Sequence, residues 1–191
     1  MKKLFLTALA LTAFAISANA QDFKIGAKAG LNIAHLRGDD AEEFGSRTSF
    51  VAGAVAQFPI SEKFSFQPEL LYSAQGAKEG NETLKFDYLN VPLMGKYYVA
   101  DGFSIQAGPQ VGFLLSAKAK GEEGDVSAEI DVKDELKNLD FGLNFGLGYE
   151  FQNGLFIDGR YNLGLSNIVE DDDVEEVYNG VFQFTLGYFF F

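Results

Sequence analysis

The chain has 191 residues, of which 15 are basic and 27 acidic, so its net charge is −12 at pH 7. An acidic chain without a basic stripe would repel phosphates, which excludes nucleic acid as a partner. The sequence has no cysteine and one histidine, which excludes disulfides, thiolate chemistry and multi-histidine metal sites, and no cofactor is expected. Its 20 phenylalanines and eight tyrosines suit strands better than helices.

Residues 1–20 have the features of a secretory signal peptide. Two lysines at positions 2 and 3 precede an apolar stretch over 4–16, and the segment ends with Ala-Asn-Ala at 18–20. The apolar stretch is too short to span a membrane comfortably, and the ending predicts cleavage before Gln21. We therefore expect export through the periplasm and a single domain over 21–191.

The rest of the chain alternates apolar and polar residues, which is the period-2 pattern of a strand with two unlike faces. Residues 139–151 show this most clearly, with Leu, Phe or Tyr at every odd position and Asp, Gly, Asn or Glu at every even one. The pattern predicts eight strands, over 23–35, 48–58, 64–76, 86–99, 103–116, 139–151, 155–166 and 180–191.

The connections between these strands alternate in length. Those after the second, fourth and sixth strands are short, at 59–63, 100–102 and 152–154, while the others are longer, polar and acidic, and the longest covers 117–138. Short turns at one end and long loops at the other are typical of a transmembrane barrel. The sequence therefore predicts an all-β fold, an eight-stranded antiparallel up-and-down transmembrane β-barrel.

The glycines indicate which face of each strand points inward. Gly108, Gly112, Gly142 and Gly146 lie on the polar face, and a narrow lumen needs small residues, because eight strands leave room for one layer of side chains and no open pore. The bulky Phe and Leu face should then contact lipid. A soluble lipocalin-like barrel, with its apolar face inside around an apolar ligand, is the alternative.

Charges enclosed in such a lumen must be paired to be tolerated. The polar faces carry four basic and four acidic residues, which predicts an interior ion-pair network: Lys24, Lys28, Glu69, Lys96, Asp140, Glu150, Asp158 and Arg160. The alternative is that these charges form a path for protons or ions through the lumen.

Several motifs resemble the PorT-like outer-membrane β-barrel proteins of Gram-negative bacteria over essentially the whole mature chain. The motifs are Gln67-Pro68-Glu69-Leu70-Leu71-Tyr72-Ser73, Tyr88-Leu89-Asn90-Val91-Pro92-Leu93, Ala107-Gly108-Pro109-Gln110-Val111-Gly112, Gly159-Arg160-Tyr161-Asn162-Leu163-Gly164-Leu165 and the aromatic C-terminus. The resemblance implies an outer-membrane location and assembly by the barrel-insertion machinery, which reads the C-terminal strand. It also accounts for prolines inside predicted strands, where they are otherwise unfavourable.

Two features near the predicted outer rim are candidate sites. His35 lies near the predicted outer rim and would need Ser46, Ser49 or Asp39 as a partner for general-base chemistry, so no catalytic residue is assigned. The acidic run Glu170, Asp171, Asp172, Asp173, Glu175 and Glu176 is a candidate divalent-cation loop. It lacks the glycine and the spacing of a dedicated calcium loop, which favours a solvated loop.

These observations predict a monomer in contact with outer-membrane lipid and without enzymatic activity. Its expected role is structural, adhesive or partner-docking, through acidic extracellular loops that meet an envelope or extracellular protein. A lipid-modifying enzyme and a small channel are the remaining alternatives.

Overall fold

The computed structural model describes residues 23–38, 44–80, 82–123, 126–171 and 175–190. The signal peptide predicted for 1–20 lies outside these residues. The described elements are β1 (Lys24–Arg37), β2 (Gly45–Ser61), β3 (Phe64–Glu79), β4 (Glu82–Ala100), β5 (Phe103–Glu123), β6 (Val126–Asp131), the 3₁₀ turn η3 (Lys133–Glu135), β7 (Leu139–Glu150), β8 (Leu155–Gly164) and β9 (Tyr178–Phe189). No helix within those ranges has the length and apolar character needed to cross a membrane.

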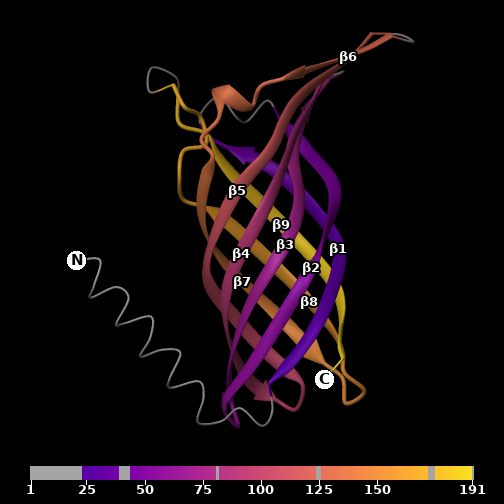
Figure 1. The fold of residues 1–191 in the computed structure, drawn as a ribbon, viewed down its shortest axis with the longest axis vertical. Helices are drawn as coiled ribbons and strands as arrows, with labels where there is room; N and C mark the ends of the chain where they lie inside the picture. The colour runs from indigo at the N-terminus through magenta and orange to yellow at the C-terminus, as the bar shows by residue number, and fades with distance from the viewer. Residues whose placement is uncertain (1–22, 39–43, 81, 124–125, 172–174, 191) are drawn as a thin grey trace, which may run out of the picture.

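Eight of the strands close into a barrel (Figure 1). Each strand pairs antiparallel with its neighbours in the chain, β5 pairs with β7, and β1 pairs with β9 to close the ring. Closure pairs the backbone of both edges, which is what a sheet in hydrocarbon requires. The predicted fold class is therefore confirmed.

Three prolines interrupt the pairing of successive strands. The register between β2 and β3 skips the level of Pro68, that between β3 and β4 skips Pro92, and that between β4 and β5 skips Pro109. Proline has no backbone N–H to donate, so each ladder opens locally and then resumes in step. The strands predicted across these prolines are nevertheless continuous.

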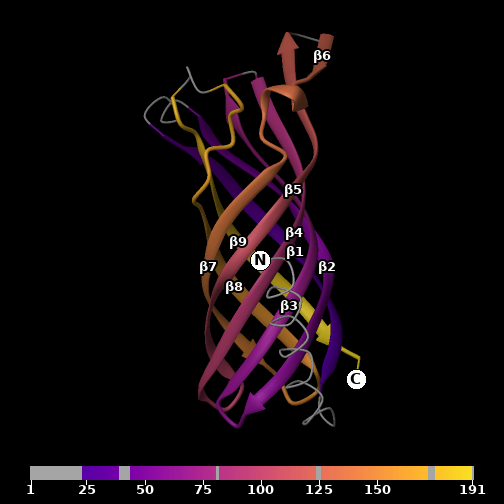
Figure 2. The same cartoon turned by 60° about the vertical axis from the view of Figure 1, so that its left-hand side comes forward.

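The two ends of the barrel differ, and we call them the turn end and the loop end. At the turn end the connections after β2, β4 and β7 are short, as predicted, and Gly102 forms one of the turns with a φ of 73°. The loop end carries the connections after β1, β3, β5 and β8, and there β5 and β6 project beyond the other strands (Figure 2).

Two predictions about the loop end were wrong. The connection after β3 is a tight turn that begins at Gly80 with a φ of 52°, because β3 and β4 remain paired as far as Glu79 and Glu82. The segment 117–138 is not one long loop, since β5 continues to Glu123 and pairs with the additional strand β6. Polar and charged residues on the outer face of these extensions hid the strand pattern.

The apolar rows face outward over the whole barrel wall. Leu31, Phe50, Leu147 and Phe184 are 51–56% exposed, whereas the polar residues on the opposite faces of the strands are buried. A lipocalin-like arrangement, with the apolar face around an internal ligand, is thus contradicted. The exposed band is what a barrel surrounded by lipid presents.

Candidate functional site

The centre of the lumen holds a compact cluster of four charged side chains. Arg160 makes a fork of two hydrogen bonds to Glu69, with N–O distances of 2.7 and 2.8 Å. Lys28 Nζ lies 2.7 Å from Glu69 and 3.8 Å from Asp158, and Arg160 lies 3.1 Å from Asp158. These side chains are at most 2% exposed, so each charge depends on the others for compensation.

Neutral side chains extend the cluster across the barrel. Gln106 donates to Asp158 at 2.6 Å and accepts from Arg160 at 2.8 Å. Lys96 reaches the cluster through Gln67, to which it donates at 3.3 Å, and Gln67 donates to Glu69 at 2.7 Å. The predicted membership of Lys96 is therefore indirect, through an amide rather than a carboxylate.

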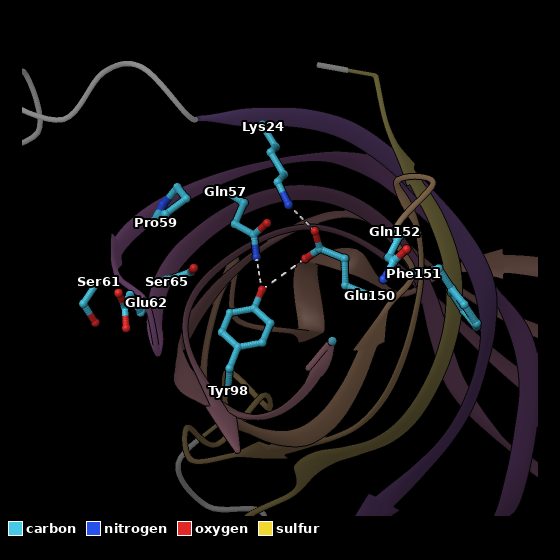
Figure 3. Close-up of a pocket in the computed structure, with 11 residues that line it drawn as sticks. Lys24, Gln57, Pro59, Ser61, Glu62, Ser65, Tyr98, Glu150, Phe151 and Gln152 are labelled. Atoms are coloured by element: carbon cyan, nitrogen blue, oxygen red, sulfur yellow. Dashed lines mark hydrogen bonds and ion pairs between the residues drawn. The ribbon is translucent and has the colours of Figure 1, made fainter. Parts of the chain in front are cut away.

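A second group of polar side chains lies at the turn end (Figure 3). Lys24 forms an ion pair with Glu150, and Tyr98 joins that carboxylate to Gln57, donating to Glu150 at 3.1 Å and accepting from Gln57 at 2.5 Å. These residues line a cavity of about 360 Å³. Lys24 is 38% exposed, so this pair stands at the mouth of the lumen rather than in its closed centre.

Asp140 departs from the predicted network. It accepts from Ser166 and Asn179, each at 2.8 Å, and has no basic partner within the described residues. The reason is its position along the barrel axis. Gly148 is the register partner of Asp158 and so marks the level of the ion cluster on β7, and Asp140 lies eight residues away along the same strand. Eight strand residues span about 27 Å, so alternation placed Asp140 correctly inside but could not place it near a cation.

The loop end of the lumen is closed by an apolar cluster that the sequence analysis missed. We call it the plug, and its buried members are Leu36, Ala77, Phe86, Tyr88, Leu114, Ala117 and Ile168. Three of them, Leu36, Ala77 and Ala117, belong to strand extensions outside the predicted strands, and Ile168 belongs to a connection. The continued alternation of small and apolar residues at 77, 84 and 86 was the available signal.

Ile168 shows how the loops join this plug. It lies between β8 and β9, is 1% exposed, and its N–H donates to the carbonyl of Val177 at 2.9 Å. The same connection forms a β-bridge between Leu136 and Val169, and Glu170 N–H donates to Glu135 at 3.0 Å. The two connections at the loop end therefore hold each other in place.

His35 does not meet its candidate partners. Its ring stacks on Tyr161 and Phe182, with centroids 6.0 and 6.2 Å away, on the outer face of the wall. Ser49 points inward and donates to the carbonyl of Ala74 at 2.6 Å, because it pairs with the inward-facing Asn32. Ser46 is exposed and Asp39 lies outside the described residues.

The candidate divalent-cation loop is described in part. Glu170, Asp171, Glu175 and Glu176 are exposed, while Asp172 and Asp173 lie outside the described residues. Within the part of the chain that the structure describes, no three acidic or histidine side chains converge as metal ligands.

Charged, amide and apolar side chains thus fill successive levels of a narrow lumen, and the fold and lumen together define a small transmembrane barrel with a packed interior. Residues 19–170 match the family model for the outer membrane protein beta-barrel domain. The chain belongs to this family and is an outer-membrane protein. Among curated proteins, none matches the sequence.

Solved structures share the fold at low sequence identity. Neisserial surface protein A (NspA) has a TM-score of 0.55 and 14% identity, over 88% of this chain and 97% of its own. Ail, the attachment invasion locus protein of Yersinia pestis, has a TM-score of 0.56 and 14% identity, over 89% of this chain and all of its own. At this identity the likeness shows the fold.

Proposed function

We propose that this barrel presents a pre-formed acidic surface at its loop end, where it docks or adheres to a positively charged partner outside the cell. One observation carries the proposal: the long connections are fixed to each other and to the plug. The Leu136–Val169 bridge and the bond from Lys137 N–H to the carbonyl of Ile168, at 2.8 Å, join the connection that leads into β7 to the connection that follows β8. A surface that is already ordered loses less entropy on binding.

The charge of this surface determines the kind of partner. The four connections at the loop end, with their flanks, contain 8 basic and 20 acidic residues. Glu170, Asp171, Glu175 and Glu176 are all exposed between β8 and β9. Such a surface attracts basic proteins and repels acidic ones, and the attraction weakens with salt.

The name of one structural neighbour supports an adhesive role. Ail is by its name an attachment and invasion protein, and one of its structures holds the heparin analogue sucrose octasulfate. That ligand is a polyanion, which the acidic loops here would repel, so the positive charge of the proposed partner is inferred from this chain alone.

The proposal also includes the biogenesis of the barrel, its subgroup within the family and its oligomeric state. Cleavage at 20, export through the periplasm and recognition of the aromatic C-terminal strand by the insertion machinery fit the sequence pattern. The motifs in β3, β4, β5 and β8 support a PorT-like member of the family, present as a monomer and without enzymatic activity.

An adhesion assay tests the proposal. Cells that display the wild-type barrel should be retained on an oligolysine-coated surface, and the retention should fall several-fold when Glu170, Asp171, Glu175 and Glu176 are changed to Gln or Asn. Added salt should weaken it likewise. The control is Glu62→Gln at the turn end, which is exposed and faces away from the loops. Equal retention of all three proteins would reject the acidic surface as the docking site.

Shortening the projecting hairpin tests whether the docking surface extends to β6. Lys118 and Asp131 are register partners, so a two-residue Asn-Gly turn can replace residues 119–130 directly. Ala117 and Val132 stay in place, and the plug should remain intact. Reduced retention would include the hairpin in the surface, and unchanged retention would confine the surface to the β8–β9 connection.

A further inference from the structure

The outer face of the strand extensions is basic, although the loop end as a whole is acidic. The register places Lys78, Thr83, Lys120 and Glu129 in one row across β3, β4, β5 and β6. A second row contains Gly76, Lys85, Lys118 and Asp131. Four lysines therefore share two adjacent rows with two acidic residues, and we call these rows the lysine face.

The lysine face points outward, on the side of the wall that meets lipid. The plug residues Phe86 and Ala117 occupy the inward positions of the same strands, and the neighbouring residues Lys85 and Lys118 must then project to the outside. Lys85 and Lys118 are 31% and 45% exposed in their side chains. Their ammonium groups are accessible from the membrane side.

The lysine face begins where the lipid-facing band ends. Leu115 is 47% exposed on the outer wall, and Lys118 follows it by three residues on the same strand. Three residues rise about 10 Å along a strand, or about 8 Å along the barrel axis at the usual tilt. Headgroups occupy about 5–7 Å on each side of the hydrocarbon. Measured from Leu115, the Lys118 backbone therefore lies at the outer boundary of the headgroup layer, where its long flexible side chain can reach the lipid phosphates.

The charges within the lysine face leave an excess of positive charge. Lys85 and Lys118 share one carboxylate, with both Nζ atoms 3.5 Å from the same oxygen of Glu129. Desolvation opposes ionisation of Glu129, but the charges of Lys118 and Lys85 outweigh it and lower the pKa of that carboxyl. One carboxylate cannot neutralise two ammonium groups, so this pair can accept a further anion.

We infer that the lysine face binds the phosphate groups of anionic lipids in the surrounding outer leaflet. A lipid is favoured over a soluble anion because the lysines adjoin the apolar band, so that one molecule can place its chains on Leu115 and its phosphate on Lys118. Each lysine near an anionic membrane surface contributes about 1 kcal/mol, which is about a five-fold change in affinity. The inference depends on the membrane location and not on the proposed docking function.

Lipid retention in nanodiscs tests the inference. The barrel is reconstituted in phosphatidylcholine nanodiscs containing a minor fraction of lipid A, and the lipid A that remains bound to each barrel is measured by native mass spectrometry. Lys118→Gln should weaken retention about five-fold, and Lys85→Gln with Lys118→Gln should weaken it further. Lys63→Gln, an exposed lysine at the turn end, removes the same charge and should have no effect.

A second pair of variants changes the charge in the opposite direction. Glu129→Gln releases both lysines and should strengthen retention, while Glu175→Gln removes an equal charge from the β8–β9 connection and should not. The inference is overturned if Lys118→Gln and Lys63→Gln retain equal amounts of lipid A, or if Glu129→Gln and Glu175→Gln do. It is also overturned if inorganic phosphate displaces lipid A as readily as a second lipid does. Adhesion to oligolysine, measured on the same variants, separates this inference from the docking proposal.

Discussion

Removal of the Glu69 charge should strongly destabilise the barrel. Glu69 accepts two hydrogen bonds from Arg160, one from Gln67, and pairs with Lys28, all between 2.7 and 2.8 Å. Glu69→Gln keeps the shape but leaves two cations against the single carboxylate of Asp158. Loss of one partner from a buried ion pair costs about 3–5 kcal/mol, and we expect that decrease in the free energy of unfolding.

Urea unfolding in detergent micelles measures this change, followed by far-UV circular dichroism because the chain has no tryptophan. Glu69→Gln combined with Lys28→Met should recover more than half of the loss, since the remaining charges balance again. The matched control is Glu150→Gln, whose partner Lys24 is 38% exposed and can be solvated, so its cost should be about 1 kcal/mol or less. The reasoning fails if Glu69→Gln and Glu150→Gln unfold at the same urea concentration.

Three further changes test the packing of the lumen. A Cβ on Gly108 would fall on the carbonyl oxygen of Leu93, so Gly108→Ala should lower the free energy of unfolding in urea by about 1–3 kcal/mol. Gly121→Ala is the control, because a Cβ there meets nothing within 4 Å and should leave the stability unchanged. Equal effects of the two variants would contradict the close approach at Gly108. Ile168→Ala should cost about 2–5 kcal/mol locally and make the β8–β9 connection a preferred site of limited proteolysis, while unchanged cleavage would show that the plug does not hold it. Tyr88→Phe removes one hydrogen bond of 3.3 Å from Asn179 and keeps the ring, so it should lower the free energy of unfolding by about 1 kcal/mol. A loss as large as that of Ile168→Ala would contradict the view that packing, rather than this hydrogen bond, stabilises the plug.

The barrel wall could be predicted because its determinant is local. Alternation fixes the direction of each side chain from its neighbours alone, so Phe50 and Leu147 outside, and Glu69 and Arg160 inside, followed from the sequence. The strands that contain Pro68, Pro92 and Pro109 were predicted correctly, because each proline interrupts the pairing with one neighbouring strand only and the flanking pairs keep the register. The extensions of β3, β4 and β5 were missed because their outer face carries lysines where the membrane wall carries phenylalanine and leucine.

The sequence by itself determined the closed sheet, the lipid-facing rows and the polar lumen, since all three depend on a two-residue period and on turn lengths. Only the tertiary structure decided which interior residues meet. Glu69 and Arg160 are 91 residues apart in the chain, and their contact depends on the stagger accumulated over several strand pairs. The same stagger separates Asp140 from the cations and brings Ile168 to Phe86, so the ion cluster, the plug and the lysine face all follow from the relative height of strands.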